Sequence, residues 1–218
     1  MEGSGLMNRV KTWIEGLDDV LEGGFPDKSV ILFIGEPGSG HVMLAQQIMY
    51  YHTLKEGKVA YFTTNRSPDA LREDFKTFGW EISPLEEDGR WVFSNDLKET
   101  SLRIEQNCWT MVDSLSYLLL TQKLKSVIDV VESLLESTRK YGGIHLLLMT
   151  HGMHDAQTET TMQHLIDGSL EFLVTEVGGT VDRRIRVKKM EKVIYAQRLI
   201  PFHISDHGIV VETAVRIA

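Results

Sequence analysis

The sequence predicts a single α/β domain with a mainly parallel central sheet, helices on both faces and an antiparallel extension at its C-terminal end. Three observations predict this fold class. Short apolar runs alternate with segments of helical periodicity, a glycine-rich loop joins one such run to a helix, and hairpin-type turns fill the last third of the chain. The 218 residues, 42% of them hydrophobic, suffice for one sizeable core.

Eight apolar runs are expected to form strands, at residues 30–34, 59–63, 91–94, 108–112, 145–150, 170–175, 184–190 and 209–212. Helical spacing occupies residues 41–55 and 125–140, and Ser67-Pro68-Asp69 opens a third helix with proline in its first turn. Because these helices separate the earlier strands, the pattern predicts strand–helix–strand units and parallel pairing.

The pattern of expected secondary structure changes after Met149. Shorter strands are expected there, separated by "VGGTVD" and "SDHGI", which are turn sequences typical of antiparallel pairing at a sheet edge. No linker or internal repeat interrupts the chain. We therefore expect one domain over residues 10–218, preceded by a flexible tail at residues 1–9.

Charge and composition disfavour nucleic acid as a partner without excluding it, and they argue against a membrane. The formal net charge of −8 opposes binding to nucleic acid and to anionic membranes, and no apolar stretch approaches the roughly 18 residues that span a bilayer. The single cysteine, Cys108, lies in an apolar run, which predicts a buried thiol and a reducing, cytoplasmic location.

The segment "GEPGSGHVML" has the glycines of a phosphate-binding loop. Such loops point backbone N–H groups at phosphate, with the dipole of the following helix behind them. The expected nucleotide-binding residues are Gly35, Glu36, Pro37, Gly38, Ser39, Gly40, His41 and Val42. A tight turn that merely connects strand to helix would show the same glycines.

The longer segment "VKTWIEGLDDVLEGGFPDKSVILFIGEPGSGHVMLAQQIMYYHTLKEGKVAYFT" resembles the KaiC-like branch of the RecA superfamily of P-loop ATPases. The resemblance continues through "PDALREDFKTFGWEI", "WTMVDSLS", "HLIDGSLEF", "RVKKM" and "PFHISDHGIVV", from about Val10 to Val211. It implies a RecA-like P-loop NTPase fold with ATP or ADP at a subunit interface. It also implies a homo-oligomer or a KaiC- or RecA-like partner protein.

The loop departs from that family at two positions. His41 replaces the lysine that contacts the β- and γ-phosphates, and Val42 replaces the hydroxyl that binds magnesium. A lost charge-assisted contact weakens binding about ten- to a hundredfold, so weak ATP or ADP binding is expected. Protonation of His41 below about pH 6.5 would restore a positive charge and raise this affinity.

Of the other catalytic positions, one acidic residue is retained and most of the rest are altered. Asp113 matches the carboxylate that holds magnesium through water, although capping of the following turn is an alternative role. The resemblance places two glutamates where Asn65 and Arg66 stand. Lys189 fits the segment that reaches a neighbouring subunit's nucleotide, whereas Glu191 replaces its arginine. An edge strand bearing solubilising charges is the simpler interpretation of that segment.

Three further features have open interpretations. "HGMHD" brings His151, His154 and Asp155 together after a central strand, where a metal site or a structural role would fit. Trp13 replaces a family glycine near the adenine or the interface region, where its bulk would fill the space of a base or a partner, or else it packs on the sheet edge. The densest run of basic residues could bind nucleic acid or form a solvated edge strand. Its members are Arg183, Arg184, Arg186, Lys188, Lys189 and Lys192.

The sequence therefore favours a pseudo-ATPase: a regulatory or assembly protein that keeps the fold and lacks the groups for hydrolysis. Two alternatives stay open. One is an unusual active ATPase or kinase that uses His41 and Asp113, and the other is a RecA- or RadA-like recombination accessory that binds DNA through the basic run.

Overall fold

The computed structural model describes residues 8–55, 57–191, 195 and 198–212. Within these residues, a nine-stranded sheet has the order β11-β10-β9-β8-β3-β7-β6-β4-β5. Its strands are β3 (Ser29–Gly35), β4 (Lys58–Thr63), β5 (Trp91–Ser94), β6 (Cys108–Asp113), β7 (Ile144–Thr150), β8 (Gly168–Val177), β9 (Thr180–Met190), β10 (Ile200–Ser205) and β11 (Gly208–Val211). A separate two-stranded sheet joins β1 (Arg9–Val10) to β2 (Phe25–Pro26).

Strand β3 is the middle strand of the nine-stranded sheet and pairs in parallel on both sides. It pairs with β7 on one side, from Ser29 opposite Ile144 to Gly35 opposite Thr150, and with β8 on the other. Strands β5, β4, β6 and β7 also pair in parallel, whereas β9, β10 and β11 follow in antiparallel order. This arrangement confirms the predicted mainly parallel sheet with a C-terminal antiparallel extension.

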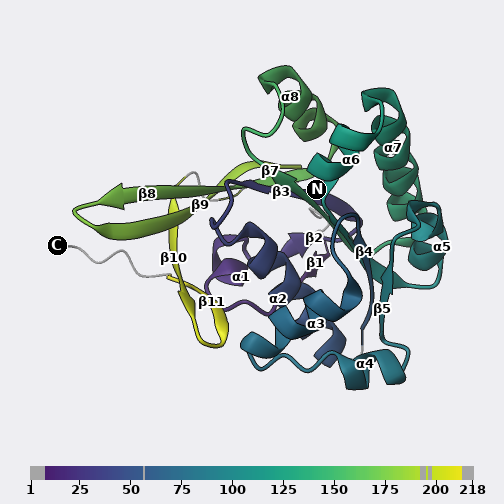
Figure 1. The fold of residues 1–218 in the computed structure, drawn as a ribbon, viewed down its shortest axis with the longest axis horizontal. Coiled ribbons are helices and arrows are strands. Elements are labelled where there is room, and N and C mark those ends of the chain that lie inside the picture. Colours follow the sequence, from purple (N-terminus) through teal and green to yellow (C-terminus); the bar gives the residue numbers. More distant parts are fainter. Residues whose placement is uncertain (1–7, 56, 192–194, 196–197, 213–218) are drawn as a thin grey trace, which may run out of the picture.

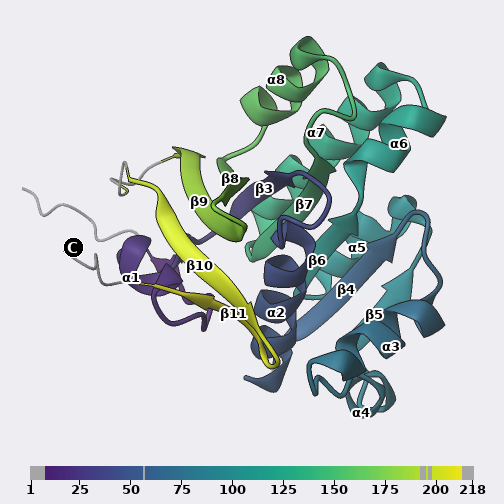
Figure 2. The same ribbon diagram turned by 60° about the vertical axis from the view of Figure 1, so that its left-hand side comes forward.

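Helices cover both faces of the sheet (Figure 1). The helices are α1 (Leu17–Val20), α2 (His41–Leu54), α3 (Pro68–Thr77), α4 (Ser83–Glu87), α5 (Thr100–Glu105), α6 (Leu115–Thr121), α7 (Leu124–Tyr141) and α8 (Ala156–Leu165), with a 3-10 turn, η1, at Leu97–Glu99. Figure 2 shows α2 and α3 on one face and α6, α7 and α8 on the other. The side chains of β3 alternate between the two apolar cores, since Ile31 and Phe33 join one and Leu32 and Ile34 the other.

Where the sequence predicts a helix end, the structure places that end within one or two residues of the prediction. The expected ranges 41–55 and 125–140 correspond to α2 and α7, and Ser67 caps α3 by accepting a hydrogen bond from the amide of Ala70. Cys108 is buried, as expected.

The C-terminal part differs from the prediction in two ways. Its first two strands, β8 and β9, are the longest in the sheet rather than short, and they form a hairpin that projects to the left in Figure 1. Strand β10 was not predicted. Gln47 of α2 holds strand β11 in place, because its side-chain amide is hydrogen-bonded to both the N–H and the C=O of Ile209.

The N-terminal boundary also needs correction. Arg9 belongs to strand β1 and faces Pro26, so the domain begins within the expected tail, and residues 1–7 of that tail lie outside the described part. Within the described residues, no helix combines the length and apolarity needed to cross a membrane.

Candidate functional site

The glycine loop leads from β3 into α2 through two left-handed backbone positions. Gly38 has φ of 79° and Gly40 has φ of 91°, values that other residues rarely adopt. A Cβ at Gly40 would lie only 3.2 Å from the Phe202 ring. Glu36, Pro37 and Gly38 are exposed, and the first N–H groups of α2 have no acceptor within the helix. The loop therefore has the backbone of a phosphate cradle.

The His41 side chain is hydrogen-bonded within the loop itself. Its Nδ1 lies 2.8 Å from Ser39 Oγ, and both side chains are buried. They fill the space above Gly35, where an added Cβ would lie 2.3 Å from Ser39 Oγ and 3.1 Å from His41 Nδ1. Burial lowers the pKa of His41 to about 4. The hypothesis that mild acidification charges His41 is therefore wrong for the folded protein.

A cleft of about 370 Å³ opens beside the loop, within the size range of small-ligand sites. Helices α2 and α3 and strand β10 form its walls. The lining residues are Gly38, Gly40, His41, Val42, Met43, Gln46, Arg66, Asp74, Thr77, Phe78 and Ile204. The predicted loop residues Gly38, Gly40, His41 and Val42 are thus gathered on one wall, whereas Asp113 does not line the cleft.

Asp113 is buried at the end of β6 and is already hydrogen-bonded. The hydroxyl of Tyr61 donates to its Oδ2 at 2.6 Å, and Gln46 donates to the Tyr61 oxygen at 3.1 Å. Burial raises the pKa of Asp113, while the Tyr61 hydrogen bond and the charge of Arg66 act in the opposite direction. The capping role falls to its neighbour instead, since Ser114 Oγ accepts from the amide of Tyr117 at the start of α6.

These donors do not fit a magnesium ion. Val42 offers no oxygen, and one oxygen of Asp113 already accepts from Tyr61. Tyr61 was not anticipated, although a tyrosine inside the apolar run "VAYFT" signals a buried hydroxyl that needs a partner.

The two residues after β4 that replace the family glutamates differ in their placement. Asn65 is exposed, and Arg66 reaches into the cleft and forms an ion pair with Asp74 of α3. The main chain of Arg66 is fixed by Thr63, whose Oγ1 lies 2.8 Å from the Arg66 carbonyl oxygen and 3.2 Å from its nitrogen. Asp74 was not anticipated, because nothing in its sequence context distinguishes it from other helix-surface carboxylates.

Each polar residue of "HGMHD" has a structural partner. His151 Nδ1 lies 2.9 Å from Glu159 Oε2, His154 Nε2 lies 3.0 Å from the Ser116 carbonyl oxygen, and Asp155 caps α8. In the part of the chain that the structure describes, no three His, Cys, Asp or Glu side chains gather as a metal site would require. The structural interpretation of this segment is favoured.

Lys189 and Glu191 lie at the end of β9, where their side chains form an ion pair at 3.0 Å. The Lys189 ammonium also donates to the carbonyl oxygens of His164 and Ile166 at the end of α8. In this single chain, both predicted interface residues are thus engaged with their own subunit.

The rest of the basic run is largely paired as well. Arg184 bonds Asp182, and both Arg186 and Lys188 approach Glu171 of β8, at 3.1 and 3.5 Å. Arg183 lies 3.4 Å from the Gly38 carbonyl oxygen, and Lys192 lies outside the described residues. These contacts favour the edge-strand interpretation over a nucleic-acid surface.

Trp13 lies far from the cleft. It packs against His52, near the C-terminal end of α2, and against Trp109, near the start of β6. Since the loop is at the opposite end of α2, the adenine-side interpretation is wrong. Trp13 has φ of 58°, a left-handed value that accounts for the glycine of the family pattern. Asp18 holds this turn by accepting from the amides of Thr12 and Trp13.

A larger cavity, of about 750 Å³, lies on the opposite face of the sheet between η1, α6 and α7. Several hydroxyls along its wall bond the main chain instead of facing a ligand. Thr63 bonds the carbonyl of Arg66, Thr64 that of Asp113 and Thr100 that of Leu97. The cleft beside the glycine loop therefore remains the better candidate site.

Comparison with known proteins is consistent with this geometry. The family model described as "ATPase: KaiC" matches residues 10–134 and 107–216. A UPF0273 protein of Thermotoga maritima is 24% identical over 94% of this chain and 96% of its own length. A UPF0273 protein of Pyrococcus horikoshii is 26% identical over 94% of each chain.

The fold is similar to a solved structure as well. The crystal structure of a KaiC-like protein from Pyrococcus horikoshii has a TM-score of 0.80 and 23% identity, over 94% of this chain and 99% of that one. At this identity, the likeness concerns the fold alone. It confirms the predicted RecA-type architecture.

Proposed function

Because the chain belongs to the KaiC family of ATPases, we propose that it is a non-hydrolysing member, a regulatory or assembly protein that holds ATP or ADP weakly or not at all. It acts through contacts with further copies of itself or with a related partner protein. The observation that carries the proposal is the state of His41, which is buried, uncharged at neutral pH and hydrogen-bonded to Ser39, where the family has a charged lysine.

Three other positions support the same conclusion. Val42 cannot bind magnesium, Asp113 accepts from Tyr61, and Arg66 stands where a water-activating glutamate is expected. Loss of one such group lowers turnover by about 10³-fold or more, so their combined loss leaves little hydrolysis. The single buried Cys108 is in keeping with a cytoplasmic protein.

The active-ATPase alternative receives no support from this geometry. A neutral His41 bonded to Ser39 is not placed to contact a γ-phosphate, and Asp113 does not line the cleft. The DNA-binding alternative is equally disfavoured, since most of the described basic run is paired with carboxylates of the same sheet.

Phosphate release from ATP in the presence of magnesium tests the proposal. The wild-type protein should release phosphate no faster than an Asp113→Asn variant, because the Asp113 carboxylate takes no part in catalysis. Rapid release that disappears in a His41→Ala variant would refute the proposal. Size-exclusion chromatography with light scattering, with and without ATP, tests the second part, and we expect an assembly whose size does not depend on nucleotide.

A further inference from the structure

The cleft beside the glycine loop contains one cation and one carboxylate. Among the described residues that line it, Arg66 and Asp74 are the charged pair, because His41 is neutral at physiological pH. Arg66 follows β4 and Asp74 lies on α3, so they face each other across a wall of the cleft. The side chains are 36% and 46% exposed, which leaves both accessible to a ligand.

The Arg66 side chain can exchange partners without a change in the fold. Its main chain is fixed by two hydrogen bonds with Thr63, whereas its side chain is held by the ion pair with Asp74. An ion pair this exposed contributes little stability, so it can open at small cost. A guanidinium has five donors in a planar fork, which matches the oxygens of a phosphate group.

The phosphate cradle lacks positive charge from any other residue of the cleft. The loop supplies backbone N–H groups and the positive end of α2, but the family lysine is replaced and its substitute is turned toward Gly35. Magnesium cannot supply the charge either, because Val42 and Asp113 do not offer a suitable set of ligands. A phosphate that enters this cleft therefore meets Arg66 as the cation of the described lining, while Arg183 lies outside that lining and donates to the Gly38 carbonyl oxygen.

We propose that Arg66 is the phosphate-binding cation of this cleft, that it binds a nucleotide phosphate without magnesium, and that Asp74 holds it when the cleft is empty. This inference rests on the proposed function, since it assigns the ligand of the same site. Asp74 competes with the ligand in two ways, by pairing with the guanidinium and by repelling phosphate.

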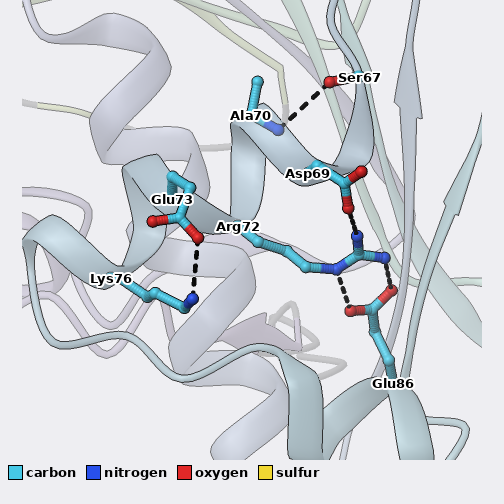
Figure 3. A network of polar contacts seen from close by, with 7 residues as sticks. All are labelled: Ser67, Asp69, Ala70, Arg72, Glu73, Lys76 and Glu86. Carbon is cyan, nitrogen blue, oxygen red and sulfur yellow. Dashed lines mark hydrogen bonds and ion pairs between the residues drawn. The ribbon is translucent and has the colours of Figure 1, made fainter.

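Matched controls lie on the same helix. Figure 3 shows Lys76 paired with Glu73, and Arg72 held between Asp69 and Glu86. None of these side chains lines the cleft. Lys76→Gln removes one positive charge from α3, and Glu73→Gln removes one negative charge from the residue next to Asp74. These two variants separate a specific effect from a change in net charge.

Calorimetric titration of the full chain with ADP, first in EDTA and then in magnesium, tests the inference. Asp74→Asn should raise ADP affinity about two- to fivefold, and Arg66→Gln should lower it about tenfold or more. Arg66→Lys should retain part of the affinity, and Asp74→Asn should give no gain when combined with Arg66→Gln. The two control variants should change affinity by less than about twofold.

Three outcomes would overturn the inference. They are unchanged affinity in Arg66→Gln, a requirement for magnesium, and no ADP binding by either the wild type or Asp74→Asn at millimolar concentration. Thermal unfolding of every variant shows whether each one is folded. None of these outcomes affects the proposed lack of hydrolysis, which fails only if the wild type releases phosphate rapidly in magnesium, so the two failures are distinguishable.

Discussion

The two ends of helix α2 each hold a histidine, buried at the loop end and partly buried near the other end, and the two side chains differ in their polar contacts. At the loop end, His41 Nδ1 lies 2.8 Å from Ser39 Oγ. Near the other end, His52 stacks on Trp109 with ring centroids 3.6 Å apart and planes 7° from parallel, and its Nδ1 has no hydrogen-bond partner among the described residues. Burial lowers the pKa of both to about 4.

This difference shows how position 41, where the family has a catalytic lysine, has taken on a structural role. His52 behaves as an aromatic ring, whose contribution is contact area with Trp109 and Trp13. His41 instead completes a small polar network above Gly35, so the loop keeps its shape although its lysine is gone. The loop end is therefore stabilised by a specific hydrogen bond and the far end by packing.

The largest expected effect is a loss of stability in acid. His41, His52 and the fully buried His145 have native pKa values near 4 against about 6.5 when unfolded, so the unfolded chain binds more protons and stability falls from pH 6.5 toward pH 4. Between pH 7.5 and 5, each should lower the free energy of unfolding by about 2 kcal/mol, or about 6 kcal/mol together. Urea unfolding at the two pH values measures this change.

Variants assign the acid effect to the two ends of α2. His41→Gln and His52→Phe should each remove about a third of the pH dependence. The difference between variants is the informative quantity, because the raised pKa of Asp113 opposes the histidines in the total. If either variant keeps the full pH dependence, that histidine is not buried in its neutral form.

The next largest effect distinguishes packing from hydrogen bonding at the far end. His52→Ala should destabilise the protein by about 3 kcal/mol, because it removes the ring between Trp109 and Trp13 and leaves a cavity. His52→Phe should change stability by less than about 1.5 kcal/mol, since the lost Nδ1 has no partner to leave unsatisfied. Thermal unfolding at pH 7.5 compares them, and a large cost for phenylalanine would contradict this account.

A smaller effect is expected at the loop end. His41→Lys should destabilise the protein by about 1–2 kcal/mol, because it removes the hydrogen bond with Ser39 and places an ammonium in a buried position. It should not restore ATP hydrolysis, since Val42 and Arg66 remain. Denaturant titration and phosphate release measure the two effects. Rapid hydrolysis by this single variant would show that lysine alone was missing.

An effect of similar size extends the comparison to Asp113. Tyr61→Phe removes the donor to its carboxylate and should cost about 1–2 kcal/mol at pH 7.5, toward the lower value if water replaces the hydroxyl. The stability cost of this substitution should shrink in acid, because the Asp113 carboxylate becomes protonated. Burial already raises the pKa of this carboxylate. An unchanged cost across pH would mean that the Tyr61 hydrogen bond does not depend on the charge of Asp113.

The sequence predicted the framework well because apolar periodicity and turn chemistry act locally. The strand that ends at Gly35, the helix after it and the cap at Ser67 follow from such patterns. Strand β10 was missed because proline and histidine interrupt its short apolar run. The hairpin of β8 and β9 was predicted too short, since charged residues fill its outer half.

The site was only partly predictable, because its geometry depends on residues far apart in the chain. The altered positions His41 and Val42 could be identified from the loop pattern alone. The inward rotation of His41, the hydrogen bond between Tyr61 and Asp113, and the ion pair between Arg66 and Asp74 required the packed structure. Sequence position indicates which groups are absent, whereas only packing shows what their replacements contact.

The attachment of Lys189 to the end of α8 has a consequence for larger complexes. In an assembly whose subunits communicate through this strand, the lysine would have to leave its own chain whenever a neighbour changed state. In this protein, moving the Lys189 side chain would leave two carbonyl oxygens at the end of α8 without their donor and would break the ion pair with Glu191. We therefore expect subunits to dissociate at the same rate in ATP, in ADP and without nucleotide, as in a permanent complex that does not cycle.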